Sequence, residues 1–127
     1  MTQGHPFVLV VEDDERLRSV IARNLWARGY TVLEAASFRD AVDRTEIKPG
    51  VVILDINLPD ASGWDVAEWL DSQDVSVPVI AISGYVTPTR EQMQHYHPAA
   101  FLPKPFTIDK LMRLVEEYTT AGPVASG

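Results

Sequence analysis

Short apolar runs alternate with segments of helical periodicity along most of this 127-residue chain. The run Val51 to Leu54 is continuously apolar, as expected for a strand that is buried on both faces of a sheet. Other runs with the composition of strands are 8–11, 31–34, 79–82 and 100–102. The alternation of such runs with helical segments predicts βαβ units around a parallel sheet. We therefore expect a (βα)5 domain of the α/β class, doubly wound, with right-handed crossovers.

Residues able to cap a helix stand before the segments of helical periodicity. They are Asp14, Ser37, Ser62, Thr87 and Thr107. Thr87 is followed by Pro88, and proline is favoured at the first position of a helix, so we expect the fourth helix over 88–95. The end of the chain consists mainly of small residues. We expect one domain over 1–120, followed by a flexible tail over 121–127.

The composition of the chain argues against several classes of function. Its net charge is -7 at pH 7, and an acidic protein lacks the basic face that contacts with nucleic acid or an anionic membrane require. It has no cysteine, which excludes disulfides, a thiol nucleophile and a cysteine zinc site. No apolar run approaches the roughly 20 residues of a membrane span, and 1–6 lacks the pattern of a signal peptide. We expect a soluble cytoplasmic protein without membrane insertion.

Polar residues stand where the predicted strands end, each after an apolar run. They are Asp13, Asp55, Ser83 and Lys104. In an open parallel sheet the carboxyl ends of the strands form one edge, and ligands bind there. We therefore expect two acids, a hydroxyl and an ammonium group to converge in one crevice. These groups suit a metal ion and a phosphoryl group better than they suit a hydrophobic core.

Three acids would lie near one another at this edge: Glu12, Asp13 and Asp55. Carboxylates that cluster in a crevice repel, and one of them protonates unless a cation neutralises the group. Oxygen ligands select a hard cation, and Mg²⁺ accepts carboxylates together with water and phosphate oxygens. The alternative is that 12–14 forms only an acidic turn that caps a helix. That alternative explains Asp14 but leaves the other acids at the same edge unexplained.

Asp55 and Lys104 are the candidates for the reaction itself. A carboxylate can attack a phosphoryl group and form an acyl phosphate, while an ammonium group and a metal ion neutralise charge. Lys104 lies between two prolines that fix its backbone, and Lys104-Pro105 is a candidate cis bond. Ser83 is followed by the small Gly84, which leaves the backbone free to approach a phosphoryl oxygen. Asp55 and Ser83 could each be an ordinary turn residue, so it is the combination that favours phosphoryl chemistry.

The motifs at these positions resemble those of the receiver domains of bacterial two-component response regulators, of the chemotaxis-regulator type. The resemblance covers nearly the whole chain and rests on residues 8–14, 54–63, 82–84 and 104–106. It implies a flavodoxin-like fold with a five-stranded parallel sheet in the order 2-1-3-4-5. It also implies a signalling domain, not an enzyme, that catalyses only its own phosphorylation and dephosphorylation.

The resemblance implies a magnesium site made by particular residues. Asp13 and Asp55 would bind Mg²⁺ directly, and Glu12 would bind it through water. The backbone carbonyl of Asn57 would be a further ligand. Glu12 stands where aspartate is more usual in the family, which is a familiar variant.

The resemblance also implies how phosphorylation occurs and how it is sensed. Asp55 would be the phosphoacceptor, and Ser83 and Lys104 would hold phosphoryl oxygens. Phe101 falls at the family's aromatic switch position, although many relatives have tyrosine there. We hypothesise that Ser83 shifts toward the phosphoryl group and Phe101 moves into the vacated space. This movement would change the face formed by the fourth helix, fifth strand and fifth helix.

The resemblance implies the kinds of partner protein but not the individual partners. The phosphoryl donor would be a sensor histidine kinase or a histidine phosphotransfer protein, and the downstream protein is unknown. Phosphorylation-dependent homodimerisation stays open, as does the choice between a single-domain regulator and the receiver of a longer protein.

Two alternative functions belong to other classes of protein. A haloacid-dehalogenase-type phosphatase would have a second aspartate at the position of Asn57, and a pseudo-receiver would keep the fold as a scaffold without phosphorylation.

Overall fold

The parallel sheet expected from the sequence forms the central layer of the protein. The structure, a computed structural model, describes residues 7–44 and 48–120. Its five parallel strands have the order β2-β1-β3-β4-β5, which confirms the predicted fold class and strand order. The strands are β1 (Phe7–Val11), β2 (Thr31–Ala35), β3 (Val51–Asp55), β4 (Val79–Ser83) and β5 (Ala100–Pro103). The helices are α1 (Glu15–Ala27), α2 (Phe38–Arg44), α3 (Gly63–Ser72), α4 (Arg90–Tyr96) and α5 (Ile108–Thr120).

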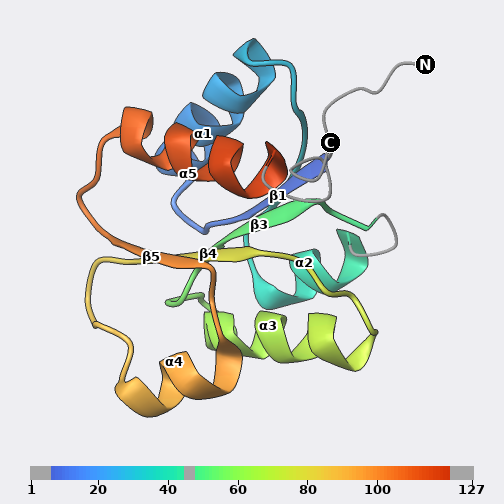
Figure 1. The fold of residues 1–127 in the computed structure, drawn as a ribbon, viewed down its shortest axis with the longest axis vertical. Helices are drawn as coiled ribbons and strands as arrows, with labels where there is room; N and C mark the ends of the chain where they lie inside the picture. Colours follow the sequence, from blue (N-terminus) through green and yellow to red (C-terminus); the bar gives the residue numbers. More distant parts are fainter. Residues whose placement is uncertain (1–6, 45–47, 121–127) are drawn as a thin grey trace.

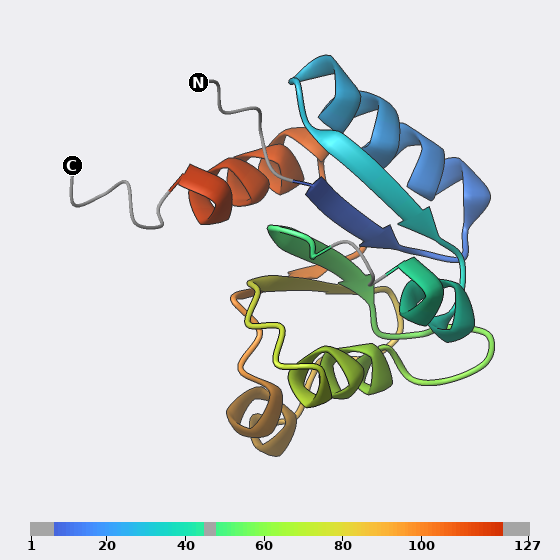
Figure 2. The same cartoon turned by 90° about the vertical axis from the view of Figure 1, so that its right-hand side faces the viewer.

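Helices cover both faces of the sheet (Figure 1). α1 and α5 lie on one face and α2, α3 and α4 on the other, as Figure 2 shows from the side. The central strand β3 contributes to both layers: Val51 and Ile53 pack with α1 and α5. Val52 and Leu54 pack with α2 and α3. All four side chains are fully buried, which explains why this run is continuously apolar.

Several of the predicted capping residues begin helices in the structure. The Asp14 carboxylate accepts hydrogen bonds from the first backbone N–H groups of α1. Ser62 and Asp65 form a reciprocal capping box at the start of α3. The Thr107 hydroxyl accepts a hydrogen bond from the backbone N–H of Lys110 at 3.1 Å, at the start of α5. These caps fix where the helices begin, and so they set the length of the loops at the edge of the sheet.

The fourth helix begins later than the sequence predicts. The prediction placed its start at Pro88, capped by Thr87, whereas α4 begins at Arg90 and Thr89 is its cap. Thr89 and Gln92 form a capping box, in which each side chain accepts a hydrogen bond of 3.0 Å from the other's backbone N–H. This box satisfies two N–H groups at once, whereas a cap at Thr87 would place Arg90, whose side chain has no acceptor, at the position that Gln92 occupies in the box. Residues 84–89 therefore form a loop beside the predicted site.

The loop that follows β3 also holds the start of α2. The Asp60 carboxylate accepts hydrogen bonds from the backbone N–H groups of Phe38 at 2.9 Å and Arg39 at 3.2 Å. These bonds lower the pKa of Asp60, the Phe38 bond most of all. The predicted cap, Ser37, acts as well, because its hydroxyl accepts from the Asp40 N–H at 3.1 Å. Two distant segments are thereby joined near the carboxyl edge of the sheet.

The described part of the chain contains no helix with the length and apolar character that a membrane span requires. The predicted tail over 121–127 lies outside the described residues. The domain boundary at residue 120 stays a prediction.

Gly63 lies where α3 meets the end of β3. A Cβ atom at this position would lie 2.6 Å from the Cα of Ile56 and closer still to the carbonyl oxygen of Asp55. We expect Gly63→Ala to lower the free energy of unfolding by about 2–3 kcal/mol, because backbone atoms cannot move aside as a side chain can. Urea denaturation measures this loss. Gly84→Ala is the matched control, since the nearest atom to its Cβ belongs to the flexible Lys104 side chain, at 3.4 Å. Equal losses in both variants would contradict the explanation.

Candidate functional site

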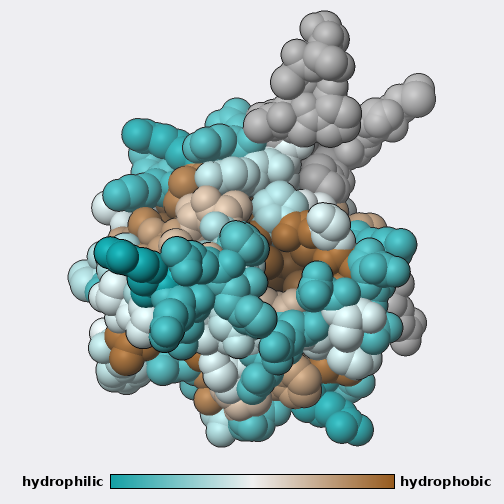
Figure 3. All heavy atoms as spheres, turned by 60° about the horizontal axis from the view of Figure 1, so that its bottom comes forward, coloured by the Kyte–Doolittle hydropathy of each residue, from teal (hydrophilic) through white to brown (hydrophobic). Residues whose placement is uncertain are grey.

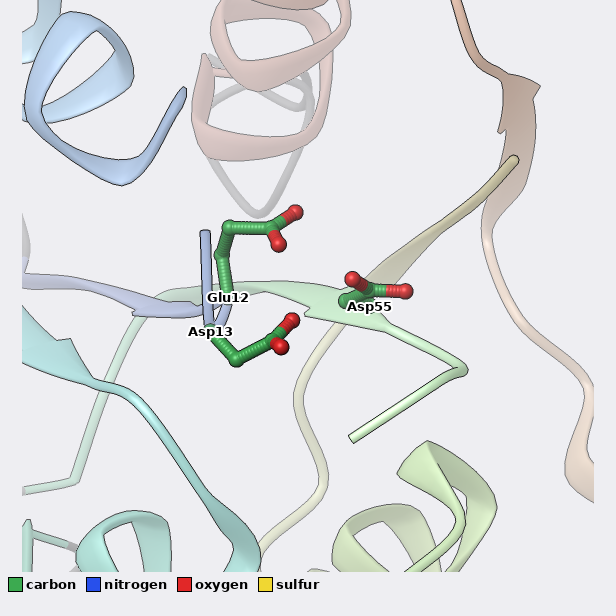
Figure 4. A group of neighbouring side chains, drawn as sticks. All are labelled: Glu12, Asp13 and Asp55. Carbon is green, nitrogen blue, oxygen red and sulfur yellow. The ribbon is translucent and has the colours of Figure 1, made fainter. Parts of the chain in front are cut away.

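The predicted site residues come together at the carboxyl edge of the sheet. Glu12 and Asp13 directly follow β1, and Asp55 is the last residue of β3. Ser83 is the last residue of β4, and Lys104 directly follows β5. Figure 4 shows the three acidic side chains turned toward a shared space, and one carboxylate oxygen from each lies within 4.8 Å of the others. The convergence follows from the strand order, which places β1, β3, β4 and β5 side by side.

Two of the three acids are buried. Glu12 is 0% and Asp55 is 2% exposed, whereas Asp13 is exposed to solvent. Burial raises the pKa of Glu12 to about 7, against the opposing effects of its hydrogen bonds with the Asp14 backbone and Lys104. The neighbouring Asp55 carboxylate raises that pKa further. A cation at this position would therefore relieve an unfavourable arrangement of charges.

Lys104 supplies one positive charge to the acids. Its Nζ lies 3.0 Å from Oε1 of Glu12 and 3.1 Å from Oδ2 of Asp55. Burial acts to lower the pKa of Lys104, but the hydrogen bond with Glu12 and the charge of Asp55 outweigh it, so the pKa is raised. The group therefore stays an ammonium ion at neutral pH. The Lys104-Pro105 bond is cis, as the sequence suggested.

The acidic set fits a magnesium ion. Its three carboxylates offer oxygen ligands, and with all of them ionised a single ammonium group leaves the site negative. Oε1 of Glu12 is buried, and the Lys104 ammonium group lies 3.0 Å from it as an ion-pair partner. Asp13 beside it is open to solvent, so a hydrated cation can reach the site. Hard oxygen ligands combined with access for water are what Mg²⁺ requires.

Each carboxylate oxygen of Asp55 contacts one neighbouring group. Oδ1 accepts a hydrogen bond from the Asn57 backbone N–H at 2.9 Å, and Oδ2 accepts one from Lys104 Nζ at 3.1 Å. These contacts fix the orientation of the side chain and leave further lone pairs on both oxygens. The carboxylate is thus held in place and is still able to act as a metal ligand or nucleophile. The proposed role of the Asn57 carbonyl as a metal ligand stays a prediction.

The Ser83 hydroxyl makes a contact that the sequence did not predict. Its Oγ donates a hydrogen bond to Oδ1 of Asn57 at 3.0 Å and accepts from the backbone N–H groups of Tyr85 and Val86 at 3.3 Å each. The family resemblance implied a role for the Asn57 backbone carbonyl alone, and the contact of its side chain was not predicted. The sequence does show an asparagine two residues after Asp55, the acid that ends β3. Asparagine is so common in turns that its position alone could not identify Ser83 as its partner.

Phe101 is partly buried on the face of the sheet that carries α3 and α4. It is directly paired with Ala81 on β4 and packs in a cluster with Ile56, Trp64 and Tyr96. The rings of Trp64 and Tyr96 stack with centroids 4.7 Å apart and an interplanar angle of 4°. A change in the position of Phe101 would therefore act on residues of both α3 and α4.

A separate hollow lies away from the acids. It has a volume of about 650 Å³ and lies between α3, α4 and the start of β4, where Figure 3 shows a hydrophobic floor among hydrophilic side chains. His95 and His97 line it, and His95 lies 3.6 Å from the Glu68 carboxylate, with both side chains largely exposed. Within 7–44 and 48–120, the acids of the sheet edge are the set placed closely enough to hold a metal ion.

Comparison with known proteins agrees with this geometry. A family model described as the response regulator receiver domain matches residues 8–116. The polar-differentiation response regulator DivK of Brucella anthropi is 27% identical over 115 residues, which cover 87% of this chain and 94% of DivK. The family-model match includes all five strands except Phe7 and all five helices except the last four residues of α5.

Solved structures are similar as well. The signal receiver domain of a putative Luxo repressor protein from Vibrio parahaemolyticus superposes with a TM-score of 0.84 at 28% identity, over 96% of this chain and 95% of that one. The response regulator protein TrrA from Thermotoga maritima, in complex with Mg²⁺-BeF, has a TM-score of 0.76 at 25% identity. That similarity covers 88% of this chain and 97% of TrrA.

The raised pKa of Glu12 predicts how stability depends on pH without Mg²⁺. Between the ordinary value of 4.5 and the folded value of about 7, the unfolded chain has lost a proton that the folded chain keeps. The contribution of Glu12 to stability therefore falls as pH rises through this window, by up to about 3 kcal/mol. Glu12→Gln removes the titration, so we expect the variant to be more stable than wild type at about pH 8 and similar to it at about pH 4.

Urea denaturation in the presence of a chelator, repeated across this range of pH, measures the difference between the two proteins. A difference that stays constant with pH would contradict the assignment of the titration to Glu12.

Proposed function

This chain belongs to the response regulator receiver domain family, and from that premise we propose that Asp55 accepts a phosphoryl group in a reaction that requires Mg²⁺. The observation that carries the proposal is the 3.1 Å ion pair between Lys104 and Asp55, beside acids that share one space. This ion pair supports the proposal because the carboxylate proposed as nucleophile lies beside a cation and beside the proposed metal ligands. The TrrA complex with Mg²⁺-BeF supports a magnesium-dependent site in a similar protein.

The Asp55 carboxylate acts as the nucleophile. One of its oxygens forms a bond to the phosphorus of the donor, the bond from phosphorus to the leaving group breaks, and Asp55 becomes an acyl phosphate. Lys104 Nζ holds a phosphoryl oxygen and balances its charge. The carboxylates of Asp13 and Asp55 and the backbone carbonyl of Asn57 would hold Mg²⁺ directly, and Glu12 would hold it through water. When bound, Mg²⁺ neutralises charge on the phosphoryl oxygens.

The same site reverses the modification. Water attacks the acyl phosphate, and Asp55 is restored as inorganic phosphate leaves. The Tyr85 side chain, two residues after Ser83, is 87% exposed, so it packs little against the site in this conformation.

Ser83 and Phe101 carry the signal away from Asp55. Ser83 moves to hold a phosphoryl oxygen, and Phe101 moves into the space that Ser83 leaves. The support is that Ser83 and Phe101 occupy neighbouring strands, and that Phe101 packs against residues of α3 and α4. A displacement of Phe101 would reshape the face of α4, β5 and α5, which a downstream protein reads.

The partners follow from this reaction. A sensor histidine kinase or a histidine phosphotransfer protein supplies the phosphoryl group, and an unidentified protein binds the altered face in the cytoplasm. Phosphorylation either leaves the chain monomeric or makes it dimerise through that face, and the oligomeric state after phosphorylation decides between the two.

Two alternatives give different outcomes. A phosphatase of the haloacid-dehalogenase type would hydrolyse phosphate esters with turnover, but the position for its second aspartate holds Asn57. A scaffold without phosphorylation would not need Lys104 aligned between Glu12 and Asp55. The alignment of Lys104 therefore favours the receiver reaction.

We expect incubation with acetyl phosphate and Mg²⁺ to add one phosphoryl group to the wild-type protein, because Asp55 is oriented and charge-balanced for attack. Mass spectrometry of the intact protein detects the adduct. Asp55→Asn should show none, because an amide is a poor nucleophile, and a chelator should abolish the adduct on the wild type. Adduct formation on Asp55→Asn would contradict the assignment of the phosphoacceptor. Sustained release of product from a generic phosphate ester would instead favour the phosphatase.

We expect Phe101→Ala to leave the yield of phosphorylated protein within about twofold of wild type while weakening the response of α4 and α5. The reason is that Phe101 lies outside the set of groups that contact Asp55 but inside the cluster that joins β5 to α4. Amide NMR shifts of α4 and α5 on addition of Mg²⁺ and beryllofluoride measure the response. The control is Phe38→Ala, which removes a partly buried phenyl ring from α2. Responses of wild-type size in Phe101→Ala would refute the switch role.

A further inference from the structure

The Ser83 hydroxyl has no hydrogen-bonding capacity left in this conformation. It is 2% exposed, donates to Oδ1 of Asn57 at 3.0 Å and accepts from the N–H groups of Tyr85 and Val86 at 3.3 Å each. A hydroxyl has one proton to donate and two lone pairs to accept with. The three contacts use all of them. Ser83 therefore cannot donate to a phosphoryl oxygen unless its bond with Asn57 breaks first.

The Asn57 side chain is held on a fixed backbone. Its own N–H donates to Oδ1 of Asp55 at 2.9 Å, and the residue forms an isolated antiparallel bridge with Ser62 at the other end of its loop. The carboxamide therefore projects from a segment anchored at the nucleophile itself. It joins the end of β3 to the end of β4 across 26 residues of sequence.

We propose that the Asn57 side chain is a positioning residue that holds Ser83 in the resting site, and that an incoming phosphoryl group competes with it for the Ser83 proton. This inference rests on the proposed phosphorylation of Asp55 and adds a residue that opposes the switch. The bond between Asn57 and Ser83 stabilises the unphosphorylated form. Its loss is part of the free-energy cost of switching, and so its strength sets how readily the phosphorylated form is reached.

Release of Ser83 also affects the loop that leads to α4. If Oγ moves, the N–H groups of Tyr85 and Val86 lose their shared acceptor. Both side chains are exposed, at 87% and 51%, so side-chain packing contributes little to holding this part of the loop. The freed N–H groups become available to a phosphoryl oxygen. The same event thereby loosens the segment that ends at the Thr89 cap of α4.

The first test needs no phosphoryl group. Hydrogen exchange of the Tyr85 and Val86 amides is followed by NMR in wild type and in Asn57→Ala. The loss of a typical hydrogen bond should raise both exchange rates by roughly two- to tenfold. Asn57→Asp keeps an acceptor oxygen and should keep exchange near the wild-type rate. The control is Asn24→Ala, the same change at the chain's other asparagine, on α1. Unchanged exchange in Asn57→Ala overturns the proposal.

The second test measures competition directly. Affinity for beryllofluoride in saturating Mg²⁺ is compared in wild type, Asn57→Ala, Ser83→Ala and the double variant. Asn57→Ala should bind roughly two- to tenfold more tightly than wild type, because the resting hydrogen bond no longer opposes the switch. In the Ser83→Ala background the same change should have no effect. Equal effects in both backgrounds, or weaker binding by Asn57→Ala, overturn the proposal.

The two tests separate this inference from the proposed function. If the wild-type protein neither binds beryllofluoride nor becomes phosphorylated, the proposed function fails, and the exchange rates still decide whether Asn57 holds Ser83. If the wild type binds beryllofluoride but Asn57→Ala changes the affinity equally with and without Ser83, the proposed function stands and the role of Asn57 is rejected.

Discussion

The burial of two carboxylates beside one ammonium group is the interaction on which the arrangement of this site depends. Glu12 and Asp55 are almost completely removed from solvent, and Lys104 lies 3.0 and 3.1 Å from them. Removing charges from water is costly unless they are paired, so this group tolerates little displacement of the strands that carry it. The sheet supplies the required rigidity, because β3 has helices packed on both of its faces. The packing of the sheet therefore also fixes the positions of the charged groups in the site.

The sequence could predict the features that arise from periodicity and from single caps. The continuous apolar run at 51–54 identified a strand buried on both faces, and the acids and lysine after successive strands identified the edge where they meet. Asp14, Ser62 and Thr107 begin their helices as expected. In each case the signal is local, or it follows from the parallel order of the strands. The same reasoning led to the acidic cluster that the structure contains.

Two kinds of feature could not be predicted from the sequence. One is the choice between neighbouring residues that could each cap a helix, and the other is a contact between groups on separate loops. Thr87 and Thr89 are both plausible caps, and the reciprocal bonds with Gln92 decide for Thr89. The bond between Ser83 and Asn57 depends on two rotamers that no pattern of spacing encodes. The cap that Asp60 provides for α2 is of the same kind, since the donor and acceptor lie on separate loops. These contacts become visible only after the strands have been placed in three dimensions.

The site draws its charged groups from the ends of three separate strands, β1, β3 and β5, and this has a consequence for quality control in signalling. No local fragment contains a complete site, so a chain in which β5 has not yet paired with β4 has the carboxylates but lacks their cation. β5 is an edge strand of four residues, and edge strands are natural places for local opening. Detachment of β5 alone would separate Lys104 from Asp55 and remove the cation that the proposed phosphorylation requires. The proposed reaction is thereby tied to the integrity of the whole sheet.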